Sequence, residues 1–192
     1  TEKRAITIYN SLMKYSQIDD TIIKLREYGF STPDITNIIS SYNEETLNVV
    51  EKNIYLLKEL ISYDKLDNIF IRFNDPLDKV RVKACILEVM NRLSFINGDT
   101  YYHLNEIANG LKVIFKIVIE EDTFYYYLNE LIKGKEVILK EDKYYLREIY
   151  DEEGTISANL LEISSNNIPI YKNIFKIIKE VEESYNIIFD EA

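Results

Sequence analysis

Apolar side chains recur at helical spacing through the first half of the chain. This pattern predicts a helix over residues 3–15 and a second helix that ends at Tyr28-Gly29, because glycine just past a helix end accepts a positive φ. Ser31-Thr32-Pro33-Asp34 then predicts a new helix, with a hydroxyl cap, a proline in the first turn and an acid near the positive helix end. Residues 25–39 therefore predict a helix, a glycine hairpin and a helix.

Two more helices are expected before residue 97. Asn43-Glu44-Glu45 caps the first and Asp75-Pro76 caps the second. The apolar face of the first consists of Leu47, Val50, Ile54 and Leu57, and that of the second of Val82, Ile86, Val89, Met90 and Leu93.

The pattern changes at Asn97-Gly98-Asp99, which predicts a turn. Thr100-Tyr101-Tyr102 is a candidate short strand, and helices are expected over residues 105–118 and 122–133. Gly134 ends the second of these helices.

A β-hairpin is expected next, with strands over residues 136–139 and 144–146 and Glu141-Asp142 in the connecting turn. Two final helices over residues 148–164 and 170–184 are separated by a break at Ser164–Pro169.

These elements predict a mainly α fold, in which a helix-hairpin-helix-like bundle is followed by a winged-helix-like unit with a small β-hairpin. The expected domains are a helix-hairpin-helix-like domain at residues 1–96, a winged-helix-like domain at residues 97–147 and connecting helices at residues 148–192.

The 192 residues are 46% hydrophobic and 29% charged, which is the range of globular proteins. The net charge of −10 is uneven: residues 1–92 carry 13 basic and 14 acidic groups, residues 93–147 carry 7 and 9, and residues 148–192 carry 3 and 10. Because nucleic-acid binding needs clustered Lys and Arg, the C-terminal quarter is a poor DNA surface. The near-neutral first half can still carry a basic patch.

The single cysteine excludes an internal disulfide framework and fits a reducing cytoplasm. No apolar run reaches the roughly 20 residues that span a bilayer, so no membrane partner is expected.

The hairpin at Gly29, Phe30, Ser31 and Thr32 is the first candidate DNA-binding site. Its glycine allows a tight turn, and the free amides that open the next helix can receive a phosphate. The alternative is an ordinary αα-hairpin, and the nearby acids Glu27 and Asp34 favour it because they repel phosphate.

Lys79, Arg81 and Lys83 form the second candidate, in the densest basic segment of the chain, with Arg72 and Arg92 nearby. Helical spacing places Lys79 and Lys83 on one face. A solvated helix face is the alternative. We expect any DNA affinity to lie within residues 22–92.

The wing-like hairpin offers a third candidate. Lys133, Lys135, Lys140 and Lys143 can touch phosphates, while Glu136, Glu141 and Asp142 oppose this. A protein spacer without DNA contact is the alternative.

No catalytic residue and no metal site is expected. Glu141-Asp142-Lys143 contains the Glu-x-Lys of metal-dependent nucleases, but it falls in a predicted turn rather than on a core strand. His103 and Cys85 are expected to be structural, and the chain contains no Gly-x-x-x-x-Gly-Lys-Ser/Thr phosphate loop.

Six segments carry a family resemblance, in order and at similar spacing over residues 22–192. They are Tyr28–Thr32, Tyr42-Asn43, Asn53–Leu57, Arg81–Leu87, Gly98–His103 and Leu131–Leu146. Together they resemble the N-terminal region of RecD-like superfamily 1 DNA helicases, which are exodeoxyribonuclease V alpha-chain-like, in the long class with an N-terminal extension. The family's second hairpin, Gly-Ile-Gly-Phe, falls at Ser62–Lys65, where the glycines are missing. Asn43 and Ile54 also replace a glycine and a proline, so the chain resembles a divergent member.

The resemblance implies a non-catalytic N-terminal fragment that binds DNA or positions domains within an ATP-dependent 5′→3′ DNA helicase of repair or recombination. Its implied partners are single-stranded or forked DNA and its own C-terminal motor. ATP and magnesium would belong to that motor, so no cofactor is expected in this fragment. The alternative is a structural or protein-docking module without nucleic-acid contact, which the charge of −10 favours.

The end of the chain, Tyr185–Ala192, resembles the approach to the adenine-contacting glutamine that opens the motor in this family. An amide suits that task because its carbonyl and NH₂ can pair with the edge of adenine. The parent gene is therefore predicted to continue with Gln and then a Gly-Lys-Thr phosphate loop. The alternative is an acidic C-terminal helix that ends there.

Overall fold

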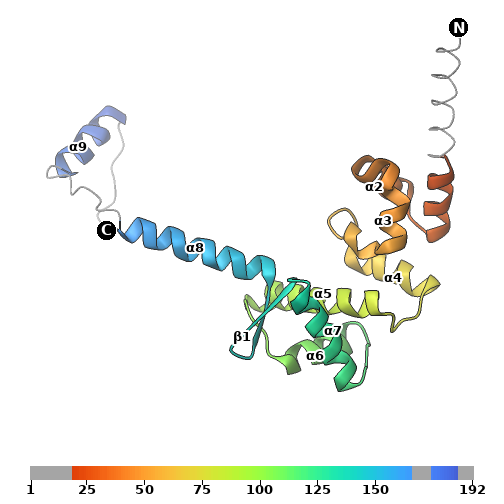
Figure 1. Cartoon of the computed structure of the whole chain (residues 1–192). Coiled ribbons are helices and arrows are strands. Elements are labelled where there is room, and N and C mark those ends of the chain that lie inside the picture. The colour runs from red at the N-terminus through yellow and green to blue at the C-terminus, as the bar shows by residue number, and fades with distance from the viewer. Residues whose placement is uncertain (1–18, 166–173, 186–192) are drawn as a thin grey trace, which may run out of the picture. The chain divides into compact units, whose positions relative to one another are not determined.

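The computed structural model describes residues 19–165 and 174–185 of the chain (Figure 1). The described residues up to Tyr150 belong to one compact unit and those from Asp151 onward to a second. The predicted helix over residues 3–15, most of the Ser164–Pro169 break and the segment after Tyr185 lie outside the described residues.

Helices make up most of the first unit, followed by a small antiparallel hairpin. After a helix over residues 19–28 come α2 (Thr32–Tyr42), the 3₁₀ helix η1 (Asn43–Glu45), α3 (Thr46–Lys52), the 3₁₀ helix η2 (Ile54–Leu57), α4 (Tyr63–Phe73), α5 (Lys79–Asn97), α6 (Leu104–Ile114), α7 (Glu121–Lys133), β1 (Val137–Lys140) and β2 (Lys143–Leu146). The mainly α fold with a small β-hairpin is thereby confirmed.

Helix α5 is the element that connects the two halves of this unit. It packs against α4 on the side of the bundle and against α6, α7 and β2 further along the chain (Figure 1). Its fully buried side chains are Val82, Cys85, Ile86, Val89 and Met90. One hydrophobic core therefore runs from Leu25 in the first helix to Val137 in β1.

Close packing of α5 on α6 depends on Gly110. A Cβ atom placed on Gly110 would lie 2.3 Å from Cγ1 of Val89, a distance that real side chains do not tolerate. Only glycine therefore fits where α6 crosses α5.

Two helix boundaries and one whole helix in the bundle differ from the sequence predictions. The helix expected to carry Leu47 to Leu57 is interrupted at Asn53, which is extended (φ −162°) and whose side chain accepts a hydrogen bond from the Tyr55 amide. The next predicted cap is also displaced, because Asp78 and not Asp75-Pro76 caps α5 through the Val80 amide. Helix α4 was not predicted at all, although Tyr63, Leu66, Ile69 and Phe70 form its buried stripe.

Helix α6 is shorter than the predicted 105–118. It ends at Ile114, where Lys116 takes a positive φ of 56° and the Ile117 amide bonds back to the Leu111 carbonyl. This turn buries both Phe115 and Ile117. The apolar residues from 113 to 119, interrupted only by Lys116, have no period that could reveal the break.

The hairpin forms as predicted, with its first strand displaced by one residue and its second strand starting one residue earlier. Lys140 pairs with Lys143, and both turn residues, Glu141 and Asp142, have positive φ. Such a two-residue turn matches the twist of the strands. The predicted short strand reduces to Tyr102, which exchanges two hydrogen bonds of 2.9 Å with Tyr144 of β2.

The second unit contains most of α8 (Arg147–Ser165) and α9 (Ile174–Tyr185). The side chains of α8 beyond Tyr150 are all exposed. No helix in the described part of the chain is long and apolar enough to cross a membrane.

Candidate nucleic-acid interface

The Gly29 hairpin is built by a helix C-terminus whose hydrogen bonds close on themselves. The Phe30 amide bonds to the Leu25 carbonyl at 3.1 Å, and the Gly29 amide bonds to the Arg26 carbonyl at 2.9 Å. This pair of bonds defines a Schellman motif, with Gly29 at φ 96° in the left-handed position. The buried contact of Phe30 with the core near Leu25 completes it.

Three of the four amides from Gly29 to Thr32 are therefore occupied, contrary to the prediction that they are free. Beyond the two amides of the Schellman motif, the Ser31 amide donates to Asp34 Oδ2 at 2.7 Å. The Asp34 carboxylate also accepts from the Ser31 hydroxyl and from Lys65 Nζ. An acid of the protein itself thus occupies the N-terminus of α2, where a phosphate would bind.

Asp34 is held in its charged form by these neighbours. Burial acts to raise the pKa of its carboxyl, but hydrogen bonds from Lys65 and Ser31 outweigh this and keep the pKa below its usual value. At neutral pH the Asp34 carboxylate is therefore ionised and paired with the Lys65 ammonium.

Arg72 is the cation that lies beside the hairpin. A Cβ atom on Gly29 would be 3.2 Å from Nη1 of Arg72, so the guanidinium rests against the bare glycine backbone. Tyr28 and Phe73 hold this arrangement through an edge-to-face ring contact at 5.5 Å. Among the described residues, no carboxylate lies within ion-pair distance of Arg72, which is exposed.

Of the predicted hairpin residues, Gly29, Ser31 and Thr32 lie at the surface, whereas Phe30 is only 4% exposed. The Phe30 ring is buried in the core and cannot contact DNA. The prediction of Phe30 as a DNA contact is therefore wrong for its side chain. We name Gly29, Ser31, Thr32 and Arg72 the hairpin surface. The hydroxyls of Ser31 and Thr32 as DNA contacts stay a prediction.

Arg81 is not a surface residue, and its prediction as a DNA contact is wrong. It is 5% exposed and grips Asp67 with two parallel hydrogen bonds of 2.8 Å, Nε to Oδ1 and Nη2 to Oδ2. Its Nη1 donates to the Pro76 carbonyl at 2.6 Å. Hydrogen bonding to Asp67 raises the pKa of Arg81, so the buried pair remains ionised.

Other polar groups complete this buried site. The Tyr55 hydroxyl donates to Asp67 Oδ1 at 2.7 Å, and the Tyr63 hydroxyl lies 3.4 Å from the Cys85 sulfur. Burial raises the pKa of the Cys85 thiol to about 12, so it is not a reactive thiolate at neutral pH. The structural interpretation of Cys85 is therefore supported by its burial.

Lys79 and Lys83 have different surroundings, although both lie on α5. Lys83 Nζ lies 3.6 Å from Glu130 Oε2 of α7. Lys79 is exposed, and no ion pair involves it within the described residues. The three predicted α5 cations do not form one surface, because one is buried and one is paired.

A sequence signal for the buried pair existed. Asp67 interrupts the apolar stripe of α4, and Arg81 stands four residues before the buried Cys85. An acid in one apolar stripe and a base bordering another indicate a buried partner. No comparable pattern marks Arg72, because its proximity to Gly29 comes from the packing of α4.

The segment where the family has a second glycine hairpin takes another geometry here. Within the described residues from Ile54 to Lys65, no residue has a positive φ. The chain enters α4 at Ser62, and Lys65 points its amine at Asp34. Where the family has these glycines, this chain starts helix α4 instead. The Lys65 amine of that helix supports the first hairpin through Asp34.

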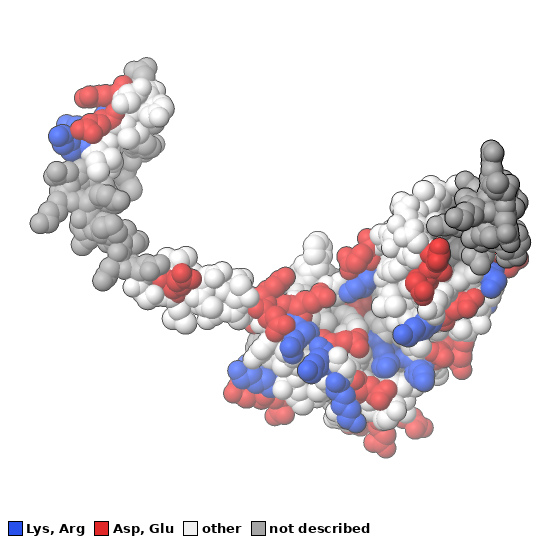
Figure 2. Space-filling model, turned by 45° about the horizontal axis from the view of Figure 1, so that its top comes forward, with Lys and Arg blue, Asp and Glu red and all other residues white. Residues whose placement is uncertain are grey.

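The wing lysines lie mostly at the surface. Lys133, Lys135 and Lys140 are exposed, while the ammonium of Lys143 sits 4.2 Å from the centre of the Tyr101 ring. At the end of α7 the positive φ of 62° falls on Lys135 and not on Gly134. On the face shown in Figure 2, Lys and Arg side chains are interleaved with Asp and Glu side chains and form no continuous basic stripe.

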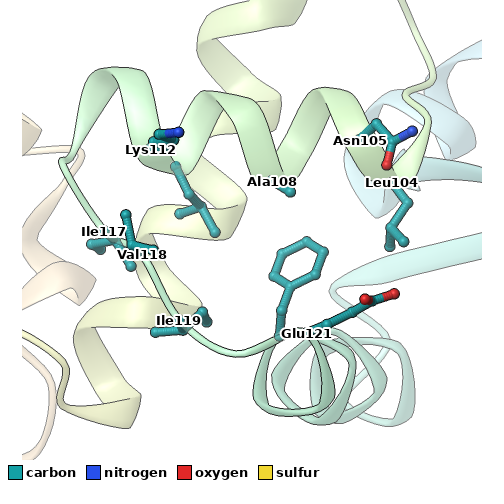
Figure 3. A pocket seen from close by; sticks show the side chains of 10 residues that line it. Leu104, Asn105, Ala108, Lys112, Ile117, Val118, Ile119 and Glu121 are labelled. Carbon is teal, nitrogen blue, oxygen red and sulfur yellow. The ribbon is translucent and has the colours of Figure 1, made fainter.

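A cavity of about 320 Å³ lies elsewhere, between α6, the segment after it and the start of α7 (Figure 3). Leu104, Ala108, Ile117 and Ile119 line it, with Lys112 among its polar residues. It contains none of the predicted DNA-binding residues. Among the described residues, no group of three His, Cys, Asp or Glu side chains could hold a metal ion.

Residues 14–101 match the family model of the HHH domain of the ATP-dependent RecD2 DNA helicase. The matched region includes the Gly29 hairpin, the buried Asp67–Arg81 pair and all of α5, and it ends just before Tyr102. This match confirms the resemblance to the N-terminal region of RecD-like helicases.

Proposed function

Because residues 14–101 belong to the helix-hairpin-helix domain family of RecD2 DNA helicases, we propose that the chain binds DNA for such a helicase. In this proposal it is a non-catalytic part of an ATP-dependent 5′→3′ enzyme of DNA repair or recombination. ATP and magnesium act in a motor domain, and single-stranded or forked DNA is the substrate. The chain's own part is to hold DNA or to position domains on it.

The observation that carries this proposal is the Arg72 guanidinium beside Gly29. A planar guanidinium can bind phosphate oxygens with two hydrogen bonds. The glycine lets a DNA backbone approach closely, because no side chain shields Arg72 there. The exposed hydroxyl of Thr32 can add a contact to the same phosphate or to its neighbour, whereas the Ser31 hydroxyl already donates to Asp34.

The region after α5 extends the proposal to a winged helix. Helix α5 is followed by a one-residue strand at Tyr102, then by the two helices α6 and α7 and the β-hairpin. The pairing of Tyr102 with β2 supports this assignment, because it adds the short strand to the hairpin as a winged helix does.

Helix α7 is poorly suited to enter a DNA groove by its N-terminus. Glu120, Glu121 and Asp122 stand there and would repel phosphates. Any DNA contact of this region is therefore expected on the hairpin side.

Fluorescence anisotropy with labelled single-stranded, duplex and forked DNA tests the proposal. Affinity should fall steeply between about 50 and 200 mM salt, because bound cations displace counterions from DNA. Arg72→Ala should weaken binding to all sequences alike and reduce the slope of log K against log salt by about 1. No binding at low salt would contradict the proposal.

Two variants control this experiment. Lys112→Ala removes the same charge from α6, outside the hairpin surface, and should leave affinity unchanged. Arg72→Lys keeps the charge but not the planar fork, so it should recover the salt slope and only part of the affinity. Equal effects of Arg72→Ala and Lys112→Ala would show that only net charge matters.

A protein-docking module is the second candidate function, and α8 favours it. Ile156, Leu160, Leu161 and Ile163 are 58%, 60%, 67% and 62% exposed, which is unusual for so many large apolar side chains on one helix. A protein surface that covers them, rather than DNA, fits the acidic composition of this part of the chain.

A further inference from the structure

The outer face of the small sheet carries a cluster of aromatic rings that neither the core nor the hairpin surface uses. Tyr102 pairs with Tyr144, and both point toward the core. Side chains alternate along strands, so the neighbours Tyr101 and Tyr145 face the other way. Their ring centres lie 5.8 Å apart.

Two more rings extend this cluster at its ends. His103 meets Tyr101 edge to face at 5.8 Å, and Tyr150 meets Tyr145 edge to face at 5.2 Å. The rings come from two segments distant in the sequence, residues 101–103 and 145–150, so the fold assembles them. We name Tyr101, His103, Lys143, Tyr145 and Tyr150 the aromatic sheet face.

Lys143 covers one face of the Tyr101 ring. Its ammonium sits over that ring at 4.2 Å from the centre, as a cation does on an aromatic face that solvent reaches. Tyr101 itself is 39% exposed. A flat aromatic ligand can take the place of the ammonium, and the freed Lys143 can then reach an anion beside it.

Basic groups lie alongside the rings on this side of the sheet. Strand pairing sets Lys140 opposite Lys143, two residues along β2 from Tyr145 and therefore on the same face as Tyr145 and its partner Ile138. The result is a row of rings next to a row of amines. Glu141 and Asp142 stand in the turn beyond the lysines, and the Glu106 carboxylate accepts a hydrogen bond from the His103 amide at the other end of the ring row.

From this arrangement we infer that the aromatic sheet face binds single-stranded nucleic acid. Unpaired bases stack on Tyr101 and Tyr145, and Lys140 and Lys143 bind the phosphates between them. Stacking on aromatic rings beside a basic track is how proteins hold single strands without reading their sequence. Duplex DNA does not fit, because its bases are already stacked on one another.

The inference shares with the proposed function only the class of ligand, since it uses different residues and one strand form. The test uses the full chain and a short oligonucleotide that contains 2-aminopurine, whose fluorescence changes when it stacks. We expect a fluorescence change with the single strand and none with the corresponding duplex. Tyr101→Leu combined with Tyr145→Leu should abolish the change and weaken single-strand binding by at least about fivefold.

Matched variants separate stacking from folding and from charge. Tyr126→Leu removes a tyrosine that is 59% exposed on α7 and should change nothing. Tyr145→Phe keeps the ring and should keep the fluorescence change. Circular dichroism melting of each variant shows whether it is folded.

The outcomes distinguish this inference from the proposed function. Loss of the fluorescence change in the tyrosine double variant, with Arg72→Ala retaining it, supports the aromatic site even if the hairpin surface binds no DNA. Single-strand binding that the folded double variant retains in full would overturn the inference, whatever Arg72→Ala does. Equal binding and equal fluorescence change with the duplex would also overturn it.

Discussion

The hairpin surface and the N-terminal half of α5 both contain the positive charge expected of a DNA-binding site, but their cations have different partners. Arg72 lies against the backbone of Gly29 with no carboxylate of the described chain in ion-pair distance. On α5, Arg81 is buried on Asp67 and Lys83 is paired with Glu130. A cation that is already paired with a carboxylate of the protein contributes little to binding a phosphate.

This difference shows why charge density along a sequence is a poor guide to a binding surface. The segment from Lys79 to Lys83 is the most basic in the chain, yet its central residue holds the core together. The less conspicuous Arg72 has the accessible geometry. Internal acids, and not the number of cations, distinguish the two surfaces.

The largest expected effect is on the α5 side, from Arg81→Ala. This variant leaves the Asp67 carboxylate buried without its partner and should lower the free energy of unfolding by about 3–5 kcal/mol. Urea unfolding measures this loss. DNA affinity of the folded fraction should stay unchanged, and a specific loss of DNA binding without loss of stability would break the comparison.

The next largest effect is expected at the hairpin, from Gly29→Ala. A side chain at φ 96° is strained, at a cost of about 1–2 kcal/mol, and the new Cβ would press on Arg72. Both stability and DNA affinity should therefore fall. Gly98→Ala is the matched control: Gly98 also has a positive φ of 75°, but no atom lies within 4 Å of its Cβ position, so only stability should fall.

Equal loss of DNA affinity in the Gly29→Ala and Gly98→Ala variants would mean that the hairpin acts through stability alone. The difference between the hairpin surface and α5 would then have no consequence for DNA binding.

A smaller effect is expected from Asp34→Asn, and it depends on pH. Because the folded pKa of Asp34 is lowered, its contribution to stability is complete above the unfolded pKa of about 3.9 and is lost as pH falls through the folded value. The variant should be less stable than the original chain at pH 7, and the difference should shrink below about pH 4. Thermal melts at both pH values measure this.

Asp34→Asn should also change DNA binding at the hairpin surface. It removes one negative charge from the edge of the hairpin surface and frees Lys65 from its ion pair. Higher DNA affinity is the expected result. Unchanged affinity at low salt would indicate that DNA does not approach the start of α2.

Some elements of this fold could be predicted from the sequence and others could not. The glycine hairpin, the start of α2 and the β-hairpin follow from local rules on caps, glycine and turns, and all three form. The break at Asn53 and the end of α6 depend on which apolar side chains the core accepts, which periodicity alone does not specify. The contact of Arg72 with Gly29 and the ring contacts across Tyr101 and Tyr145 are tertiary, so no local pattern reports them.

The smallest expected effect comes from Glu130→Gln, which releases Lys83 without moving it. The pair at 3.6 Å is partly exposed, with side chains 31% and 38% accessible, so its loss should cost at most about 1 kcal/mol. If α5 takes no part in DNA binding, the freed ammonium should leave the affinity unchanged. Anisotropy with the same forked DNA decides this. A gain in DNA affinity in Glu130→Gln would mean that α5 has a second DNA-binding surface and that the ion pair with Glu130 blocks it. That result would contradict the distinction drawn between α5 and the hairpin surface.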